Sequence, residues 1–173
     1  RLAETGTGVA HCPISNMKLS SGIARIPEML KLGVRVGLAV DGSASNDGSD
    51  LLEELRTGFL LHRLNSSSAA PTGYDMLKIA TRGSASILGR DDIGQIAEGM
   101  AADFFLINMD RLSLTGAQFD VSSMLGTVGY KGNVDYTVVN GRVVVCEGRL
   151  TGVDEEKITA EANHCVSRYL GRS

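Results

Sequence analysis

The sequence is poor in cysteine, and this shortage argues against two classes of protein. Among 173 residues there are three cysteines, Cys12, Cys146 and Cys165, which are far apart and form no CxxC pair. An odd number of widely spaced cysteines argues against both a disulfide framework and a cysteine zinc site. We therefore expect a reducing, cytoplasmic setting, with Cys12 as a buried packing residue.

Long apolar runs and an excess of charge of one sign are also missing. No run approaches the ~20 apolar residues that a membrane span needs. The net charge is −3, with acids and bases interspersed, so there is no basic surface for nucleic acid. Hydrophobic residues make up 43% of the composition, which is enough for a packed core. We expect one substantial domain, or one with a small second, and neither nucleic acid nor membrane as a partner.

The first 90 residues alternate apolar runs with helical patterns. The runs at 7–12 and 35–40 are typical of strands buried on both faces, and amphipathic helices are predicted at 23–32, 50–64, 72–81 and 84–88. Segments 14–22 and 41–49 have the composition of loops. This β-loop-helix order predicts an α/β fold with a parallel sheet and helices outside it.

Two polar residues, His11 and Asp41, stand at the carboxyl ends of the predicted strands, where α/β folds carry their sites. An unpaired carboxylate is costly to bury. Asp41 therefore needs solvent, a hydrogen-bonding loop or a metal ion. On the pattern alone, a loop-capping aspartate is the better interpretation, because Asp-Gly sequences commonly form turns.

From residue 91 the pattern becomes β-rich. Short apolar runs alternate with glycine turns, and Asn140-Gly141 within VVNGRVVV predicts a hairpin with a type I′ turn. We expect Asp103 to serve turn geometry there. An amphipathic helix is predicted at 154–170 and closes the sequence.

Three segments resemble one known family. HCPISNMKLSSGI, GLAVDGSASNDGSDLLEELR and ASILGRDDIGQIAEGMAADFFLINMD are similar to the last third of the amidohydrolase superfamily, in its branch of nucleobase and triazine deaminases and most like the 8-oxoguanine deaminases. The resemblance implies the C-terminal strands and helices of a (β/α)₈ TIM barrel plus part of a small β-sandwich domain. Residues 1–90 would hold barrel strands 7 and 8, residues 91–153 a segment of the composite β domain, and residues 154–173 a C-terminal helix.

The resemblance also implies a reaction. Asp41 would bind one divalent metal ion, most often zinc, and accept the proton of a metal-activated water. The expected conversion is 8-oxoguanine to urate plus ammonia, and the alternative is a hydroxytriazine or another purine or pyrimidine aminohydrolase. His11 would bind the heterocyclic substrate or tie down the 41–49 loop. Ser43, Ser45 and Asn46 would support the site, or serve only as ordinary turn residues.

Several family features have no counterpart in this sequence. The family's His-x-His pair and its other metal-binding histidines are missing, and the three histidines present, His11, His62 and His164, have no metal-ligand spacing. A barrel alone needs roughly 250 residues. We therefore expect the C-terminal part of an enzyme, inactive by itself, with the other metal ligands outside it. A non-catalytic product kept for binding or assembly is the second alternative, and a homodimer is left open.

Overall fold

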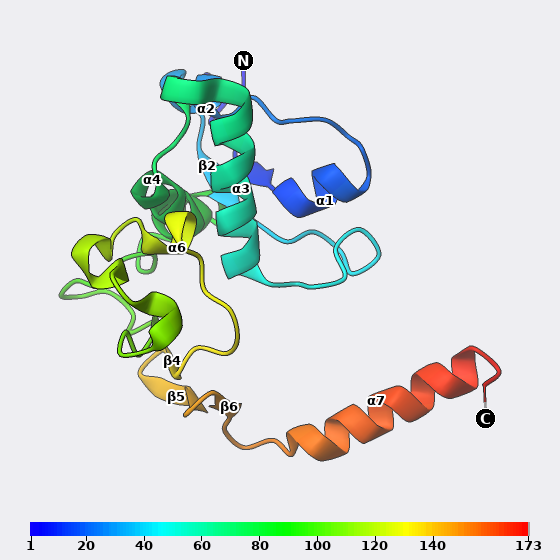
Figure 1. Cartoon of the computed structure of the whole chain (residues 1–173). Coiled ribbons are helices and arrows are strands. Elements are labelled where there is room, and N and C mark those ends of the chain that lie inside the picture. Colours follow the sequence, from blue (N-terminus) through cyan, green and yellow to red (C-terminus); the bar gives the residue numbers. More distant parts are fainter. Residues whose placement is uncertain (173) are drawn as a thin grey trace. The chain divides into compact units, whose positions relative to one another are not determined.

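The computed structural model describes residues 1–172, which form two compact units (Figure 1). The first unit contains residues 1–102 and 108–132, and the second contains residues 103–107 and the chain from 133 onward. The units follow internal contacts and so differ from the expected segments 1–90, 91–153 and 154–173. The assignment of those segments to a barrel and a composite β domain stays a prediction.

The first unit is built on a pair of short parallel strands, as the sequence pattern predicts. β1 (Val9–His11) pairs with β2 (Val36–Leu38), and His11 lies opposite Leu38. All three residues of β2 are buried. The strands are shorter than the apolar runs at 7–12 and 35–40, but the α/β arrangement with outer helices is confirmed.

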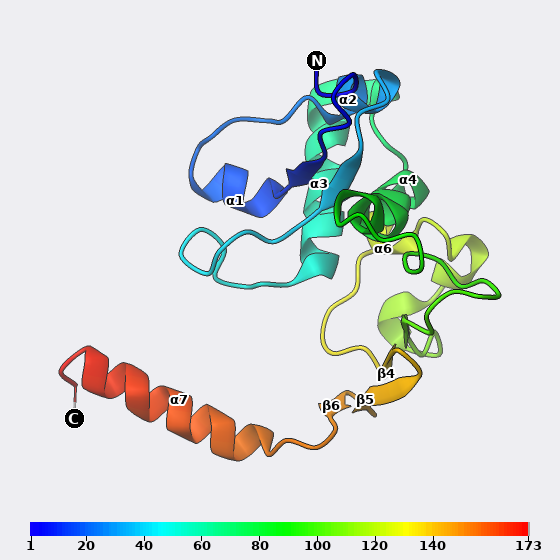
Figure 2. The same cartoon turned by 180° about the vertical axis from the view of Figure 1, so that it is seen from behind.

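Helices surround this pair of strands. In Figure 1 α3 stands in front of the strands, and in Figure 2, seen from behind, it lies beyond them, so it covers one face of the pair. The core of the unit includes the buried side chains of Ile26, Leu55 and Met76. The helices are α1 (Pro13–Lys18), α2 (Ile26–Lys31), α3 (Leu51–Ser66), α4 (Gly73–Lys78), α5 (Ser84–Ile87) and α6 (Met124–Thr127), with 3₁₀ turns η1 (Ser67–Ala69), η3 (Leu112–Leu114) and η4 (Ala117–Asp120) and a π-helical turn η2 (Ile79–Gly83).

The predicted loop at 14–22 is wrong in its first part, where α1 forms. Pro13, which directly follows the apolar run at 7–12, occupies the first turn of this helix. Proline is well suited to that position, because its missing N–H would be unpaired there in any case. The helix carries Ser15, whose hydroxyl donates to Asp41.

The continuous segment α4–η2–α5 packs directly on β2. The Ser84 hydroxyl accepts a hydrogen bond from the Leu38 amide and donates to the Leu38 carbonyl, both at 3.1 Å. A Cβ atom on Gly83 would overlap the carbonyl oxygen of Val36, and one on Gly37 would lie 2.8 Å from Ser84 Cα. The helical segment therefore reaches the backbone of β2 only because glycine stands at both contact points.

The second unit is an antiparallel sheet followed by a helix. Its strands are in the order β3 (Phe104–Leu106), β4 (Tyr136–Val139), β5 (Arg142–Cys146) and β6 (Arg149–Leu150). Asn140 and Gly141 have φ values of 48° and 76°, which confirms the predicted hairpin turn. Asp103 accepts the Asn140 amide at 2.5 Å, so its expected turn role is confirmed. The predicted C-terminal helix is α7 (Glu155–Tyr169).

No helix among residues 1–172 is both long enough and apolar enough to cross a membrane.

Candidate functional site

Asp41 lies in the loop that follows β2, three residues beyond the end of the strand. Its backbone is left-handed, with a φ of 67°, and its side chain is exposed. The burial penalty considered from the sequence therefore does not arise. A non-glycine residue in this conformation is uncommon and is found most often at turns and functional sites.

Three hydrogen bonds hold the Asp41 carboxylate. Oδ2 accepts the hydroxyls of Ser15 at 2.6 Å and Ser45 at 2.8 Å, and Oδ1 accepts the Gly42 amide at 2.8 Å. The Ser15 hydroxyl first, then Ser45 and Gly42, holds the pKa of Asp41 below its usual value. The result is an ionised, oriented and solvent-accessible carboxylate.

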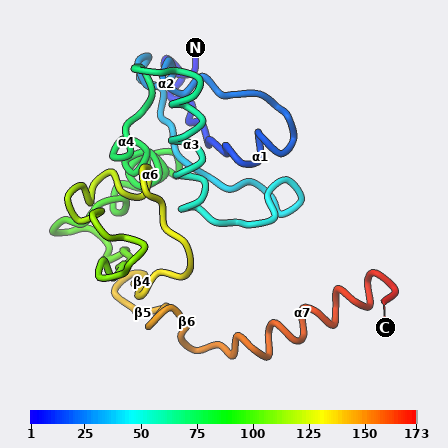
Figure 3. Tube along the Cα trace, in the orientation of Figure 1, coloured from blue at the N-terminus to red at the C-terminus, as the bar shows by residue number. Residues whose placement is uncertain are grey.

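The loop that carries Asp41 is anchored to α1 at two points. Figure 3 shows the trace of residues 39–50 running beside α1. Ser15, which is 2% exposed, reaches Asp41 from this helix, and Lys18 Nζ lies 2.5 Å from Asp47 Oδ2. Ser15 was not singled out from the sequence, because its segment was predicted to be a loop.

The other predicted loop residues differ in their surroundings. Ser43 is exposed, whereas Ser45 is half-buried and bonded to Asp41. Asn46 is only 2% exposed, and its Oδ1 accepts the Gly48 amide at 3.1 Å. The amides of Ser45 and Asn46 both donate to the Gly42 carbonyl, so this part of the loop is one tight turn.

Glu54, on the first turns of α3, is a site-supporting residue that sequence reasoning missed. It is fully buried, with Oε2 accepting the Ile14 amide at 3.0 Å and Oε1 accepting the Asn46 side-chain amide at 2.5 Å. Burial raises the pKa of the Glu54 carboxyl, and the two hydrogen bonds oppose that change. No feature of the sequence marks Glu54 as buried, because a glutamate on a helix ordinarily faces solvent.

His11 and His62 form a buried pair that the sequence did not predict. Their Nε2 atoms lie 3.1 Å apart, the side chains are 1% and 0% exposed, and neither Nδ1 has a hydrogen-bond partner among the described residues. Burial, and then the neighbouring His62, lowers the pKa of His11 to about 4, and burial also lowers the pKa of His62. The His11 ring meets His62 in this interaction, and the expected role of His11 toward the substrate or the 41–49 loop stays a prediction.

Cys12 is half-buried, not fully buried as expected. Desolvation, followed by the Asp41 and Glu54 carboxylates, raises the pKa of its thiol. A raised pKa keeps the thiol protonated at neutral pH, and only the thiolate is an effective nucleophile. Cys12 is therefore unsuited to nucleophilic catalysis here.

The donor set of this site fits one metal-ligand position. Asp41 presents an ionised carboxylate to solvent, and the hydrogen bonds from Ser15 and Ser45 fix the orientation of that carboxylate. This arrangement is expected of a metal ligand that is supported by neighbouring side chains. Residues 1–172 contain no group of three histidine, cysteine or acidic side chains that would hold a metal ion. Any complete metal centre would need further ligands from other residues.

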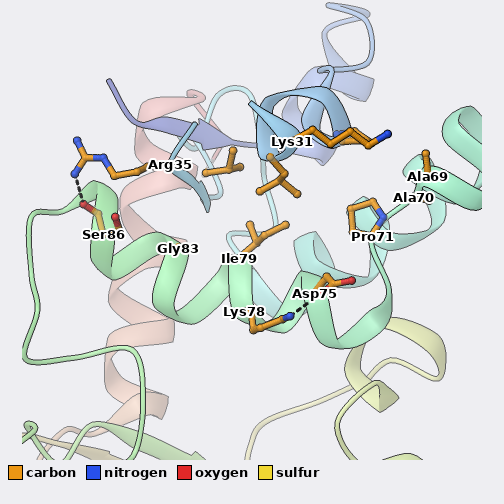
Figure 4. A pocket seen from close by; sticks show the side chains of 13 residues that line it. Lys31, Arg35, Ala69, Ala70, Pro71, Asp75, Lys78, Ile79, Gly83 and Ser86 are labelled. Atoms are coloured by element: carbon orange, nitrogen blue, oxygen red, sulfur yellow. Dashed lines mark hydrogen bonds and ion pairs between the residues drawn. The ribbon is translucent and has the colours of Figure 1, made fainter. Parts of the chain in front are cut away.

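A separate cavity of about 480 Å³ lies between α2, β2 and the α4–η2–α5 segment (Figure 4). Two of its three basic side chains are engaged: Arg35 donates to the Ser86 carbonyl at 2.9 Å, and Lys78 Nζ lies 2.7 Å from Asp75 Oδ1, whereas no such contact within residues 1–172 is found for Lys31. Neither Asp41 nor the histidine pair lines it. It therefore does not belong to the candidate site.

The chain belongs to the amidohydrolase family, whose sequence pattern matches residues 1–144. This confirms the family that the three sequence segments indicated. A crystal structure of atrazine chlorohydrolase from Arthrobacter aurescens TC1, complexed with zinc, aligns with a TM-score of 0.88 at 36% identity, covering 94% of this chain and 36% of that one.

Three curated relatives act on different heterocycles, as their names state. Hydroxydechloroatrazine ethylaminohydrolase from Pseudomonas sp. (strain ADP) is 44% identical over 98% of this chain and 36% of its own length. The 5-methylthioadenosine/S-adenosylhomocysteine deaminase of Pelotomaculum thermopropionicum is 41% identical, with coverages of 99% and 40%. The 8-oxoguanine deaminase of Pseudomonas aeruginosa is 42% identical, with coverages of 98% and 37%. The chain thus spans about two fifths of the length of these relatives.

Proposed function

We propose that this chain is part of a metal-dependent hydrolytic deaminase that releases an amine or ammonia from a small aromatic heterocycle. The observation that carries the proposal is the Asp41 carboxylate, exposed, ionised and fixed by three hydrogen bonds beyond the end of β2. In α/β folds the carboxyl ends of the strands carry the reacting groups. The similarity to a zinc-containing hydrolase supports the metal.

Asp41 has two tasks in this proposal. Asp41 would contribute a carboxylate oxygen to a divalent ion, preferably zinc, whose remaining ligands would come from outside these residues. Such an ion lowers the pKa of a bound water to about 7. The Asp41 carboxylate accepts a proton and later delivers it to the leaving nitrogen, as a general base and then a general acid.

Ser15 and Ser45 limit the motion of the Asp41 carboxylate. Both hydroxyls donate to Oδ2 and the Gly42 amide donates to Oδ1, which leaves one lone pair, on Oδ1, for the ion. Acceptance of a proton at Oδ2 then requires one serine hydroxyl to turn away. Ser43, exposed in the same loop, is available to a substrate edge. We assign no substrate contact to His11, because its ring is buried against His62.

In the complete enzyme, β1 and β2 would be strands 7 and 8 of a (β/α)₈ barrel, and β3–β6 would belong to a small β-sandwich domain. The parallel register of β1 and β2 and the antiparallel order of β3–β6 support this assignment. The proposal includes a cytoplasmic location and a homodimer.

We propose two substrate classes, 8-oxoguanine and hydroxytriazines, and the relatives support them equally. The experiment measures release of ammonia or alkylamine by the complete protein that contains these residues, with zinc supplied. The panel comprises 8-oxoguanine, guanine, adenosine, 5-methylthioadenosine and N-alkylated hydroxytriazines. Turnover of a triazine without purine activity would reject 8-oxoguanine as the substrate. Absence of amine release from every compound in the panel would favour the non-catalytic alternative.

A further inference from the structure

We propose that Glu54 is a positioning residue for the Asp41 carboxylate, an inference that rests on the proposed function. Glu54 makes no hydrogen bond to Asp41. Instead, it fixes the two chain segments from which the Asp41 hydrogen bonds come.

The two partners of Glu54 are sequence neighbours of the two serine donors. Ile14, whose amide binds Oε2, directly precedes Ser15 on α1. Asn46, whose side chain binds Oε1, directly follows Ser45 in the loop. Ser15 and Ser45 both donate to Asp41 Oδ2, so the single carboxylate of Glu54 fixes how far the Ser15 segment of α1 lies from the Ser45 segment of the loop.

Stability of α3 does not explain this arrangement. The helix is already capped by Asp50, whose Oδ1 accepts the amides of Leu52 at 2.9 Å and Glu53 at 3.2 Å. Both partners of Glu54 are neutral amides, so no opposite charge compensates the buried carboxylate through these bonds. An apolar side chain at this position would leave the Ile14 amide and the Asn46 side chain without these acceptors. The carboxylate is therefore retained for its two acceptor directions.

The two hydrogen-bond directions of Glu54 can be tested by exchanging its carboxylate with the side-chain amide of Asn46. In Glu54→Gln, one oxygen still accepts the Ile14 amide, but the new NH₂ meets the NH₂ of Asn46. In Asn46→Asp, two carboxylates face each other. In the double variant, the amide at position 54 donates to the carboxylate at position 46, whose second oxygen still accepts the Gly48 amide. Both connections of residue 54 are then present: the bond from the Ile14 amide is unchanged, and the bond to position 46 has its donor and acceptor exchanged.

Two readouts apply to the complete zinc-loaded protein: zinc retention against a chelator, and kcat and KM for the substrate found active in the panel. We expect each single variant to lose about 10–100-fold in zinc affinity and in kcat, with a smaller change in KM. The double variant should recover to within a few-fold of wild type. Asp75→Asn is the matched control, since it removes a hydrogen-bonded carboxylate from the capping box of α4, away from the 41–49 loop.

Three results would overturn the positioning role. They are wild-type zinc retention and kcat in Glu54→Gln, failure of the double variant to recover although circular dichroism shows it folded, and equal losses in Asp75→Asn. Failure of the proposed function looks different. In that case wild type releases no amine from any substrate, while zinc retention still falls in both single variants and returns in the double variant.

Discussion

Acid should weaken the fold through the buried pair of His11 and His62. A histidine whose pKa is lowered by folding is neutral at pH 7 in both the folded and the unfolded chain, so it has little effect on stability there. Between pH 6.5 and the lowered pKa, the histidine binds a proton in the unfolded chain but stays neutral in the folded chain. The free energy of unfolding therefore falls between pH 6.5 and 4 and levels off below the folded pKa.

The magnitude follows from the pKa of His11, which burial lowers from 6.5 to about 4. One pKa unit corresponds to about 1.4 kcal/mol, so this residue alone should remove about 2 kcal/mol at pH 5 and about 3 kcal/mol at pH 4. His62 acts in the same direction, because burial lowers its pKa as well. A loss of this size is a large fraction of the stability of an ordinary domain.

The assay is urea unfolding followed by circular dichroism at pH 7, 6, 5 and 4. We compare wild type, His11→Gln, and His164→Gln as a control on the exposed surface of α7. Between pH 7 and 5 wild type and the control should lose about 2 kcal/mol more than His11→Gln. Parallel curves for wild type and His11→Gln, or an NMR titration of His11 with a pKa near 6.5, would refute the reasoning.

Three further predictions concern single substitutions. Asp41→Asn should keep the circular dichroism spectrum but reduce the rate of amine release to a few per cent of wild type or less, which corresponds to an activation free energy higher by about 2 kcal/mol or more. Substantial remaining turnover would exclude Asp41 as metal ligand and proton acceptor. Gly83→Ala should lower the free energy of unfolding by about 1–3 kcal/mol, because the new Cβ would overlap the carbonyl oxygen of Val36 in β2. Gly48→Ala should cost less, because the atom nearest to its new Cβ lies 3.5 Å away, and equal urea midpoints for the two variants would contradict this prediction. Thr72→Ala removes the side chain that accepts the Asp75 amide in the α4 capping box and should cost about 1 kcal/mol, which an unchanged midpoint would disprove.

The sequence by itself determined the features that depend on near neighbours. The apolar runs predicted two parallel strands, because each run carries its hydrophobic signal within a few residues. The expected burial holds for β2, but in β1 Ala10 is exposed. Asp50 and Asn140-Gly141 predicted a helix start and a hairpin turn, because a cap or a turn is formed by adjacent backbone groups. The same signals placed Asp41 in a loop after a strand, and the family motifs indicated the chemistry expected there.

Only the tertiary structure decided which polar groups meet. Ser15 and Asp41 are 26 positions apart, Ile14 and Glu54 are 40 apart, and His11 and His62 are 51 apart. No periodic pattern encodes such pairs, because a polar residue on a helix has the same local sequence whether it faces water or a distant partner. Packing α1 and α3 around the loop after β2 makes these contacts, and the same packing buries Glu54 and His62.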